Sequence, residues 1–252
     1  MSAAGGPGAA GGAPIRAVLF DKDGTLFDFG ATWNGWAQAL IADLSRGEAA
    51  LARRLADSLR FDPGAGRFRP DSPVIAGTNR EAAECLARAL PGADPALLER
   101  DLARRAAMAP LAPAVDLAPF LDRLAGAGLV LGVMTNDAES SARAQLGGAG
   151  VLDRFAFVAG FDSGHGAKPA PEPLWAFCDA VGLPPEAALM VGDSTHDLIA
   201  GRRAGMRTIG VLTGLAPAEE LAPHADAVLP DIGHLPGWLA AARPRADAGG
   251  RG

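Results

Sequence analysis

From residue 116 onward, short apolar runs alternate with amphipathic stretches, and this alternation limits the folds open to the chain. The apolar runs predict strands at Leu129–Thr135, Phe155–Ala159, Ala188–Gly192 and Arg207–Val211, with a weaker strand at Ala227–Leu229. Helical spacing occurs between them, at 116–126, 138–147, 171–181 and 195–204. Such alternation indicates βαβ units, whose parallel strands are covered by helices on both faces. The run Ile15–Phe20 predicts a further strand of the same sheet, because it could not bury itself alone.

The segment between this first strand and residue 116 has a different pattern. Residues 33–60 and 78–108 have helical spacing, no strand pattern interrupts them, and the polar stretch Asp62–Gly77 joins them. We therefore predict an α/β fold, in which a Rossmann-like parallel sheet core carries an inserted small helical cap domain. The core would comprise 14–30 and 111–241, and the cap 31–110. The Gly/Ala/Arg-rich ends, 1–13 and 242–252, are expected to be disordered tails.

Composition and charge exclude several classes of protein. Apolar residues make up 49% of the 252 residues and charged residues 21%, which excludes global disorder. No apolar run approaches the roughly 18 residues of a membrane helix, and residues 1–13 lack the features of a secretory signal. Two cysteines exclude a disulfide framework and favour a cytoplasmic location. The net charge of −6 argues against nucleic acid as a partner, and we expect a monomer or homodimer without membrane partners.

Carboxylates follow two of the predicted strands. Asp21 and Asp23 come after the first strand, and Asp193 and Asp197 come after Ala188–Gly192. Ligands of parallel sheets bind beyond the carboxyl ends of the strands, so these four acids are expected in one crevice. Four neighbouring carboxylates repel each other, and Mg²⁺ is the natural counter-charge. Each acid alone would read as a helix cap or turn former, but two clusters at matching strand ends favour a metal site.

The segments FDKDGTLFD, VMTND, Lys168-Pro169 and VGDSTHDLIAGRRAGM resemble the four motifs of the haloacid dehalogenase-like hydrolase superfamily, in the expected order. The similarity is greatest to its phosphoglycolate phosphatase-like branch. Only one helix and one strand fit between Thr135 and Lys168, so the sizeable insert, at 31–110, follows the first motif. That is where the phosphoglycolate phosphatase-like and β-phosphoglucomutase-like members of the superfamily carry their helical C1 cap.

The resemblance implies a role for each acid of the motifs. Asp21 would be the nucleophile that forms an aspartyl-phosphate and would also face the metal ion. Asp23 would be the general acid and then the general base, and would bind the metal ion through its backbone carbonyl. Gly24 would let the backbone turn sharply beside the phosphate. Asp193 would bind Mg²⁺ directly, and Asp197 would bind it through water or orient Lys168.

The resemblance also assigns the groups that hold the phosphoryl oxygens. Thr135 and the backbone N–H groups around Asn136 would bind them, and Lys168 would neutralise their charge. Lys168 is one of only two lysines among 23 Lys and Arg residues, so its type is an exception in an arginine-rich chain. The other is Lys22, where an apolar residue is common in the family; we expect it to pair with a nearby carboxylate. His165 is either a solvated loop residue or close to the substrate.

Polar residues of the cap are candidates for reading the rest of the substrate. Arg67, Arg69, Thr78, Asn79 and Arg80 lie in or next to a Gly/Pro-rich segment, and any of them could bind a carboxylate such as that of phosphoglycolate. The alternative is that the arginines are ordinary surface residues of an arginine-rich chain.

The sequence therefore predicts a Mg²⁺-dependent phosphatase acting on a small phosphorylated metabolite, with phosphoglycolate as the leading candidate. Asp23 favours hydrolysis of a phosphate ester, since dehalogenases lack an acid at that position. Two alternatives remain. One is a β-phosphoglucomutase-like sugar phosphomutase, which would use the same motifs. The other is a catalytically inactive binding or regulatory module, although inactivity would be expected to erase some of the motif residues.

Overall fold

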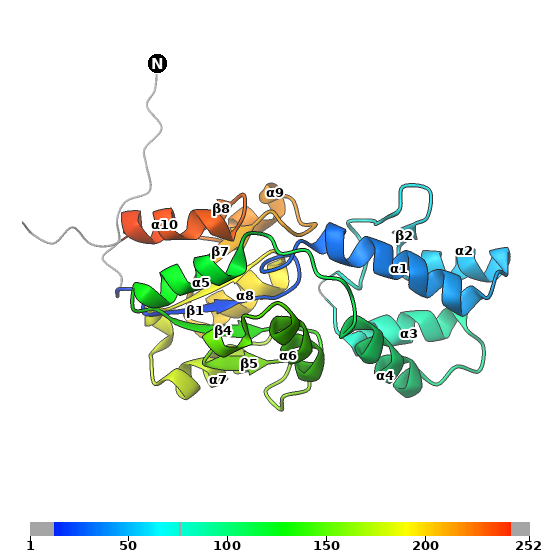
Figure 1. The fold of residues 1–252 in the computed structure, drawn as a ribbon, viewed down its shortest axis with the longest axis horizontal. Helices are drawn as coiled ribbons and strands as arrows, with labels where there is room; N and C mark the ends of the chain where they lie inside the picture. The colour runs from blue at the N-terminus through cyan, green and yellow to red at the C-terminus, as the bar shows by residue number, and fades with distance from the viewer. Residues whose placement is uncertain (1–12, 76, 243–252) are drawn as a thin grey trace, which may run out of the picture.

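The computed structural model describes residues 13–75 and 77–242. The predicted tails, 1–13 and 242–252, therefore lie outside the described residues except at positions 13 and 242. Six parallel strands form the main sheet in the order β5-β4-β1-β6-β7-β8 (Figure 1). Their bounds are β1 Ala17–Phe20, β4 Val130–Met134, β5 Phe157–Ala159, β6 Ala188–Gly192, β7 Arg207–Val211 and β8 Ala227–Leu229. The predicted α/β fold with a parallel sheet is confirmed.

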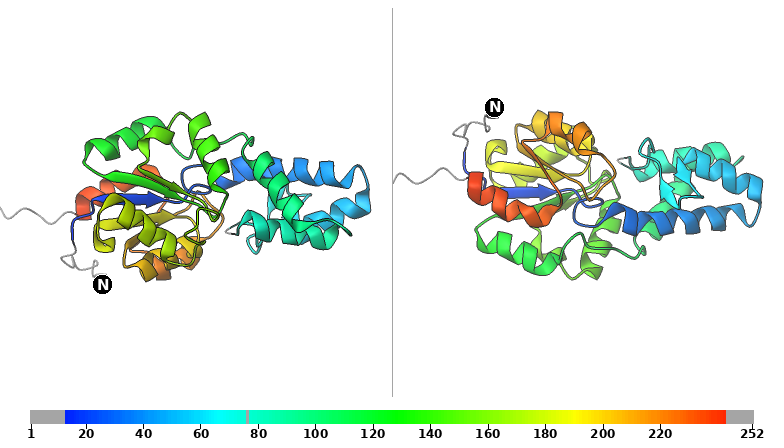
Figure 2. Two further views of the ribbon diagram at one scale, coloured as in Figure 1. Left: turned by 90° about the horizontal axis from the view of Figure 1, so that it is seen from below. Right: turned by 90° about the horizontal axis from the view of Figure 1, so that it is seen from above.

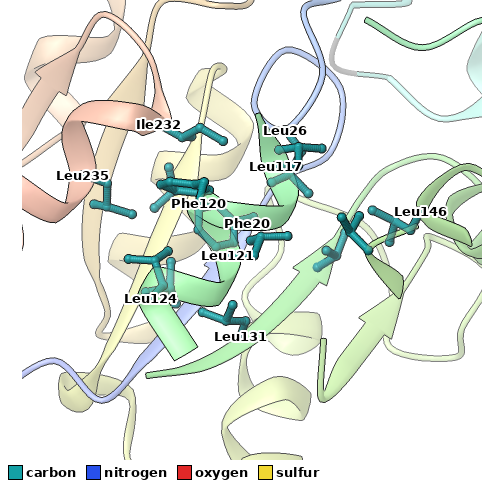
Figure 3. Close-up of a cluster of buried hydrophobic side chains, with 14 of the residues drawn as sticks. Phe20, Leu26, Leu117, Phe120, Leu121, Leu124, Leu131, Leu146, Ile232 and Leu235 are labelled. Atoms are coloured by element: carbon teal, nitrogen blue, oxygen red, sulfur yellow. The ribbon is translucent and has the colours of Figure 1, made fainter. Parts of the chain in front are cut away.

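Helices cover both faces of this sheet. They are α5 Leu117–Gly126, α6 Glu139–Gly148, α7 Glu172–Val181, α8 Thr195–Ala204, α9 Ala218–Leu221 and α10 Leu235–Ala242. Short 3₁₀ helices occur at Leu152–Arg154, Pro185–Ala187, Ala222–His224 and Ile232–His234. Helices α5, α6 and α10 pack on one face and α7 and α8 on the other (Figure 2). Figure 3 shows Phe120 and Leu121 of α5 beside Phe20 of β1, in the apolar layer that holds α5 on the sheet.

A second group of helices lies beyond the carboxyl ends of the strands (Figures 1 and 2). It comprises α1 Phe29–Ser45, α2 Ala49–Ser58, α3 Asn79–Ala89 and α4 Pro95–Ala106. These helices share a hydrophobic cluster of their own, separate from the two clusters on the sheet. We call this group the cap. Asp28 begins it, because its side chain accepts the N–H of Ala31 at 2.8 Å and caps α1.

The structure differs from the sequence prediction at one place in the cap and adds detail elsewhere. The stretches of helical spacing at 33–60 and 78–108 each contain two helices, α1 with α2 and α3 with α4. Arg46 and Gly47 have φ of 50° and 85° and end α1 in a left-handed turn. Two strands, β2 Phe61–Asp62 and β3 Arg67–Phe68, pair within or beside the stretch predicted as loop. Each has two residues, too few for any strand periodicity to be visible in the sequence.

The chain passes between core and cap twice, and the two connecting segments are hydrogen-bonded to each other. Asp28 N donates to Ala112 O at 2.8 Å, and Ala114 N donates to Leu26 O at 2.9 Å. Phe27 and Pro113 form the antiparallel bridge between these bonds. We call this pair of segments the hinge ladder. Among the helices built from described residues, none combines the length and apolar character needed to span a membrane.

Candidate active site

Three carboxylates meet at the carboxyl end of the sheet. Asp21 follows β1 and Asp193 follows β6, and these two strands are parallel neighbours. Asp197 lies in the first turn of α8, where its Oδ2 accepts the N–H and the hydroxyl of Ser194 at 3.0 and 2.7 Å. One oxygen of each carboxylate lies within 4.8 Å of the others, and all three residues are buried. Asp197 is thus both a helix-capping residue and a member of the cluster.

Lys168 supplies a positive charge within this cluster. Its Nζ lies 2.5 Å from Asp21 Oδ1 and 2.6 Å from Asp197 Oδ1, and donates to Met134 O at 2.8 Å. Burial alone would lower the pKa of Lys168, but the carboxylates of Asp197 and Asp21 outweigh it and raise that pKa. The lysine is therefore held in its charged form.

The carboxylates carry more charge than one lysine offsets. Burial raises the pKa of Asp21 to about 7, although Lys168 opposes this shift. Burial also raises the pKa of Asp193 well above its ordinary value, and the charge of Asp21 adds to it. A buried set of carboxylate oxygens with excess negative charge fits Mg²⁺, which prefers oxygen ligands.

The backbone packs closely around Asp193. A Cβ atom added at Gly24 or Gly214 would overlap the Asp193 carboxylate, and Gly24 also has φ of +82°. Thr25 Oγ1 donates to Asp193 Oδ1 at 3.4 Å. Gly24 therefore permits the Asp193 carboxylate to approach the backbone closely, in addition to the sharp turn expected from the sequence.

Asn136 positions the loop that carries Lys168. Its Nδ2 donates to Lys168 O at 2.9 Å, and its Oδ1 accepts the N–H of Lys168 at 2.9 Å. Thr135 Oγ1 accepts the N–H of Asp137 at 3.1 Å. Thr135 and Asn136 are both buried and line the same cavity as Lys168. That these residues bind phosphoryl oxygens stays a prediction.

Asp23 lies outside the three-carboxylate cluster and has partners of its own. Its Oδ2 is 2.6 Å from Lys22 Nζ, and its Oδ1 accepts the indole N–H of Trp33, from the cap, at 2.9 Å. Lys22 is completely buried, donates to Gln145 Oε1 and lies 3.4 Å from Asp137 Oδ2. The expected pairing of Lys22 with a nearby carboxylate is confirmed. Asp23 therefore lines the cavity with both of its carboxylate oxygens held by neighbouring side chains.

A cavity of about 100 Å³ lies between cap and core. Asp137 and His196 lie on its polar side, together with the core residues that the sequence predicted for the site. Those predicted residues are Asp21, Asp23, Thr135, Asn136, Lys168, Asp193 and Asp197. From the cap, Thr78 and Asn79 reach the lining, and Asn79 Nδ2 donates to Asp137 Oδ1 at 2.7 Å.

The three candidate arginines of the cap are not brought to the cavity. Arg67, Arg69 and Arg80 are exposed and do not belong to the described lining. Arg80 pairs with Glu99 at 3.3 Å, with its side chain 66% exposed. Their long charged side chains stay in water, as surface arginines do. His165 is likewise exposed and lies outside the lining, with its ring centroid 6.3 Å from that of Phe157.

Some lining residues were not selected from the sequence. His196 stands within the fourth motif and Asp137 within VMTND, so their proximity to the site was visible, although no role was assigned. Trp33 and Trp36 follow the first motif at helical spacing, a pattern that is also typical of a helix face packed into the hydrophobic core. The sequence does not distinguish a core tryptophan from one that lines a cavity.

Comparison with known proteins agrees with this geometry. The family model of the haloacid dehalogenase-like hydrolases matches residues 15–205. The chain is 34% identical over 238 residues to a phosphoglycolate phosphatase of Rhodospirillum rubrum, covering 92% of this chain and 94% of that protein. It is 31% identical over 217 residues to an N-acetylmuramic acid 6-phosphate phosphatase of Pseudomonas putida, covering 82% and 86%.

A solved structure has a similar fold. CbbY from Rhodobacter sphaeroides, determined in complex with phosphate, superposes with a TM-score of 0.65 at 21% identity, covering 88% of this chain and 96% of that one. The resemblance inferred from the four motifs is confirmed, and the curated relatives are phosphoric monoester hydrolases. The chain belongs to the haloacid dehalogenase-like hydrolase family and is one of its phosphatases.

Proposed function

We propose that this protein is a Mg²⁺-dependent phosphatase that hydrolyses a small phosphomonoester through an aspartyl-phosphate on Asp21. The observation that carries the proposal is the buried cluster of Asp21, Asp193, Asp197 and Lys168 on the floor of the cavity. Asp21, Asp193 and Asp197 would hold Mg²⁺, with the backbone carbonyl of Asp23. When bound, Mg²⁺ supplies positive charge that offsets the charge of the phosphoryl oxygens and the carboxylates.

Hydrolysis would then take place in two steps, and Asp23 would transfer a proton in each. A carboxylate oxygen of Asp21 bonds to phosphorus as the ester P–O bond breaks, and Asp23 gives its proton to the departing oxygen. In the second step, Asp23 takes a proton from a water molecule whose oxygen bonds to the same phosphorus. The bond between Asp21 and phosphorus breaks, so phosphate leaves and the Asp21 carboxylate is restored. Lys168, which touches Asp21, stays charged throughout and offsets the negative charge that gathers there.

The first substrate to test is phosphoglycolate, because several relatives are phosphoglycolate phosphatases. One relative of similar identity acts on N-acetylmuramic acid 6-phosphate, so larger esters belong in the same panel. Location in the cytoplasm and a monomeric or homodimeric state stay predictions from the sequence.

The experiment is phosphate release from a panel of phosphomonoesters, with Mg²⁺ and with EDTA. Turnover should require Mg²⁺ and fall to background in Asp21→Asn. The matched control is Asp122→Asn, which changes a carboxylate that is 60% exposed and pairs with Arg154, and it should keep wild-type turnover. Isomerisation of β-glucose 1-phosphate would favour the sugar phosphomutase instead. If no ester of the panel is hydrolysed, the phosphatase proposal is refuted and the inactive binding module remains.

A further inference from the structure

The cavity above Asp21 continues from the polar floor into the cap, and its cap side is apolar except for Thr78 and Asn79. The side chains there come from three cap helices and the segment between α2 and α3. They include Trp33 and Trp36 of α1, Leu86 of α3, Leu102 of α4, and Phe68 and Ile75 between α2 and α3.

Helix α1 presents a continuous apolar stripe to this cavity. Phe29, Trp33, Trp36 and Leu40 follow the spacing of one helix face. Trp33 and Trp36 meet edge to face, with ring centroids 5.2 Å apart and an interplanar angle of 88°. Trp36 lines the cavity and is only half-buried. The polar end of Trp33 is taken up by Asp23.

The charged groups of the lining gather at the opposite, core end. Among the described lining residues Lys168 is the one lysine or arginine, and its ammonium already contacts Asp21 and Asp197. A second negative charge on the ester, directed into the cap, would leave water and meet apolar side chains. The described lining of the cap offers it the uncharged Thr78 and Asn79 but no lysine or arginine. Burial of a charge without a partner is strongly unfavourable, whereas burial of an apolar group there is favourable.

We infer that the apolar cap side of the cavity binds the body of the substrate, which is therefore a phosphomonoester of an uncharged alcohol with an apolar or aromatic group. This inference rests on the proposed phosphatase function and narrows its substrate class. It ranks phosphoglycolate, which has a carboxylate and no apolar body, below esters of this class.

The test compares esters that share an unactivated primary alcohol as leaving group. We expect kcat/KM for 2-phenylethyl phosphate to exceed that for ethyl phosphate and for phosphoglycolate by at least about tenfold, because even one methylene in an apolar pocket is worth about that much. The gain over ethyl phosphate should arise mainly in KM. A kcat/KM for phosphoglycolate equal to or above that for 2-phenylethyl phosphate in the wild-type protein overturns the inference while leaving the phosphatase intact. The absence of Mg²⁺-dependent turnover on every ester overturns both.

Variants at Trp36 locate the effect in the cap. Trp36→Ala should lower the ratio of kcat/KM for 2-phenylethyl over ethyl phosphate by about fivefold or more, and Trp36→Arg should raise kcat/KM for phosphoglycolate. The matched control is Trp175→Ala, which removes a tryptophan that is 42% exposed on α7, outside the lining. It should keep the wild-type ratio, and an unchanged ratio in Trp36→Ala would overturn the inference. Circular dichroism checks that each variant is folded, and the wild-type panel decides the matter if a variant is not.

Discussion

Replacing Lys22 by methionine tests how much a completely buried cation contributes to this fold. The Lys22 ammonium lies 2.6 Å from Asp23 and 3.4 Å from Asp137, and it donates to Gln145. Burial alone would lower the pKa of Lys22, but the carboxylates of Asp23 and Asp137 outweigh it and raise that pKa. Methionine keeps most of the apolar stem, so the substitution removes chiefly the charge and leaves two neighbouring carboxylates without their cation.

The size of the effect follows from burial. Removing one partner of a buried ion pair costs about 3–5 kcal/mol, because the remaining charge stays uncompensated. The side chains of Asp23 and Asp137 are 17% and 8% exposed, so water reaches them slightly and the lower end applies. We expect Lys22→Met to lower the free energy of unfolding by about 3 kcal/mol at pH 8. Arg104→Met is the matched control: that side chain is 68% exposed and pairs with Asp101, so its loss should cost about 0.5 kcal/mol.

Urea denaturation followed by circular dichroism measures both variants. The loss in Lys22→Met should become smaller as the pH is lowered from 8. Burial raises the pKa of Asp137 in the folded protein even with Lys22 present, and removal of the cation raises it further. A carboxyl whose folded pKa is raised stabilises the fold while protonated, and this contribution is lost as the pH rises through the raised value. A loss no larger than that of Arg104→Met, or one independent of pH, would refute the reasoning.

Two other perturbations address the carboxylate cluster. Gly214→Ala places a Cβ on the Asp193 carboxylate, so kcat/KM at fixed Mg²⁺ should fall about tenfold to a hundredfold and recover partly at higher Mg²⁺. Gly237→Ala, where nothing lies within 4 Å of the added atom, should match the wild-type rate, and equal rates in both variants would contradict the steric argument. Burial raises the pKa of Asp21 to about 7, so without Mg²⁺ the stability contributed by its proton is present below pH 4 and lost as the pH rises toward 7. Mg²⁺ should therefore raise Tm more at pH 8 than at pH 5 in calorimetric scans against EDTA, and equal shifts at both pH values would count against a metal ion held by Asp21.

The core of the fold was predictable because its signals are local. Strands β6 Ala188–Gly192 and β7 Arg207–Val211 have the bounds expected from their apolar runs. Asp21 and Asp193 meet because they follow β1 and β6, which are parallel neighbours. The cap was less predictable. Strands β2 and β3 are held by a turn in which Asp62 Oδ1 accepts the N–H groups of Gly64 and Ala65, a pattern that a loop prediction also accommodates.

The parts of the site that escaped prediction depend on contacts between distant segments. Lys22 meets Gln145 across 123 positions of the chain, and only the completed fold shows that they touch. Arginine content does not show which arginines reach the cavity, so Arg67, Arg69 and Arg80 are candidates from the sequence although they are exposed and outside the described lining. Periodicity finds the buried face of α1, but whether that face packs against protein or borders a cavity is decided by the other cap helices.

The hinge ladder also has a consequence for how the chain reaches this structure. Parallel pairing of β1 with β4 joins Ala17 to Val130, so the core cannot form this strand pair without closing a loop that contains the whole cap. The ladder bonds between Asp28 and Ala112 and between Leu26 and Ala114 bring the two ends of that loop together. A cap that forms first, with its ladder in place, shortens the loop still to be closed and reduces its entropic cost by about 1 kcal/mol. The same bonds that join cap to core would then let the insertion assist folding of the sheet it interrupts.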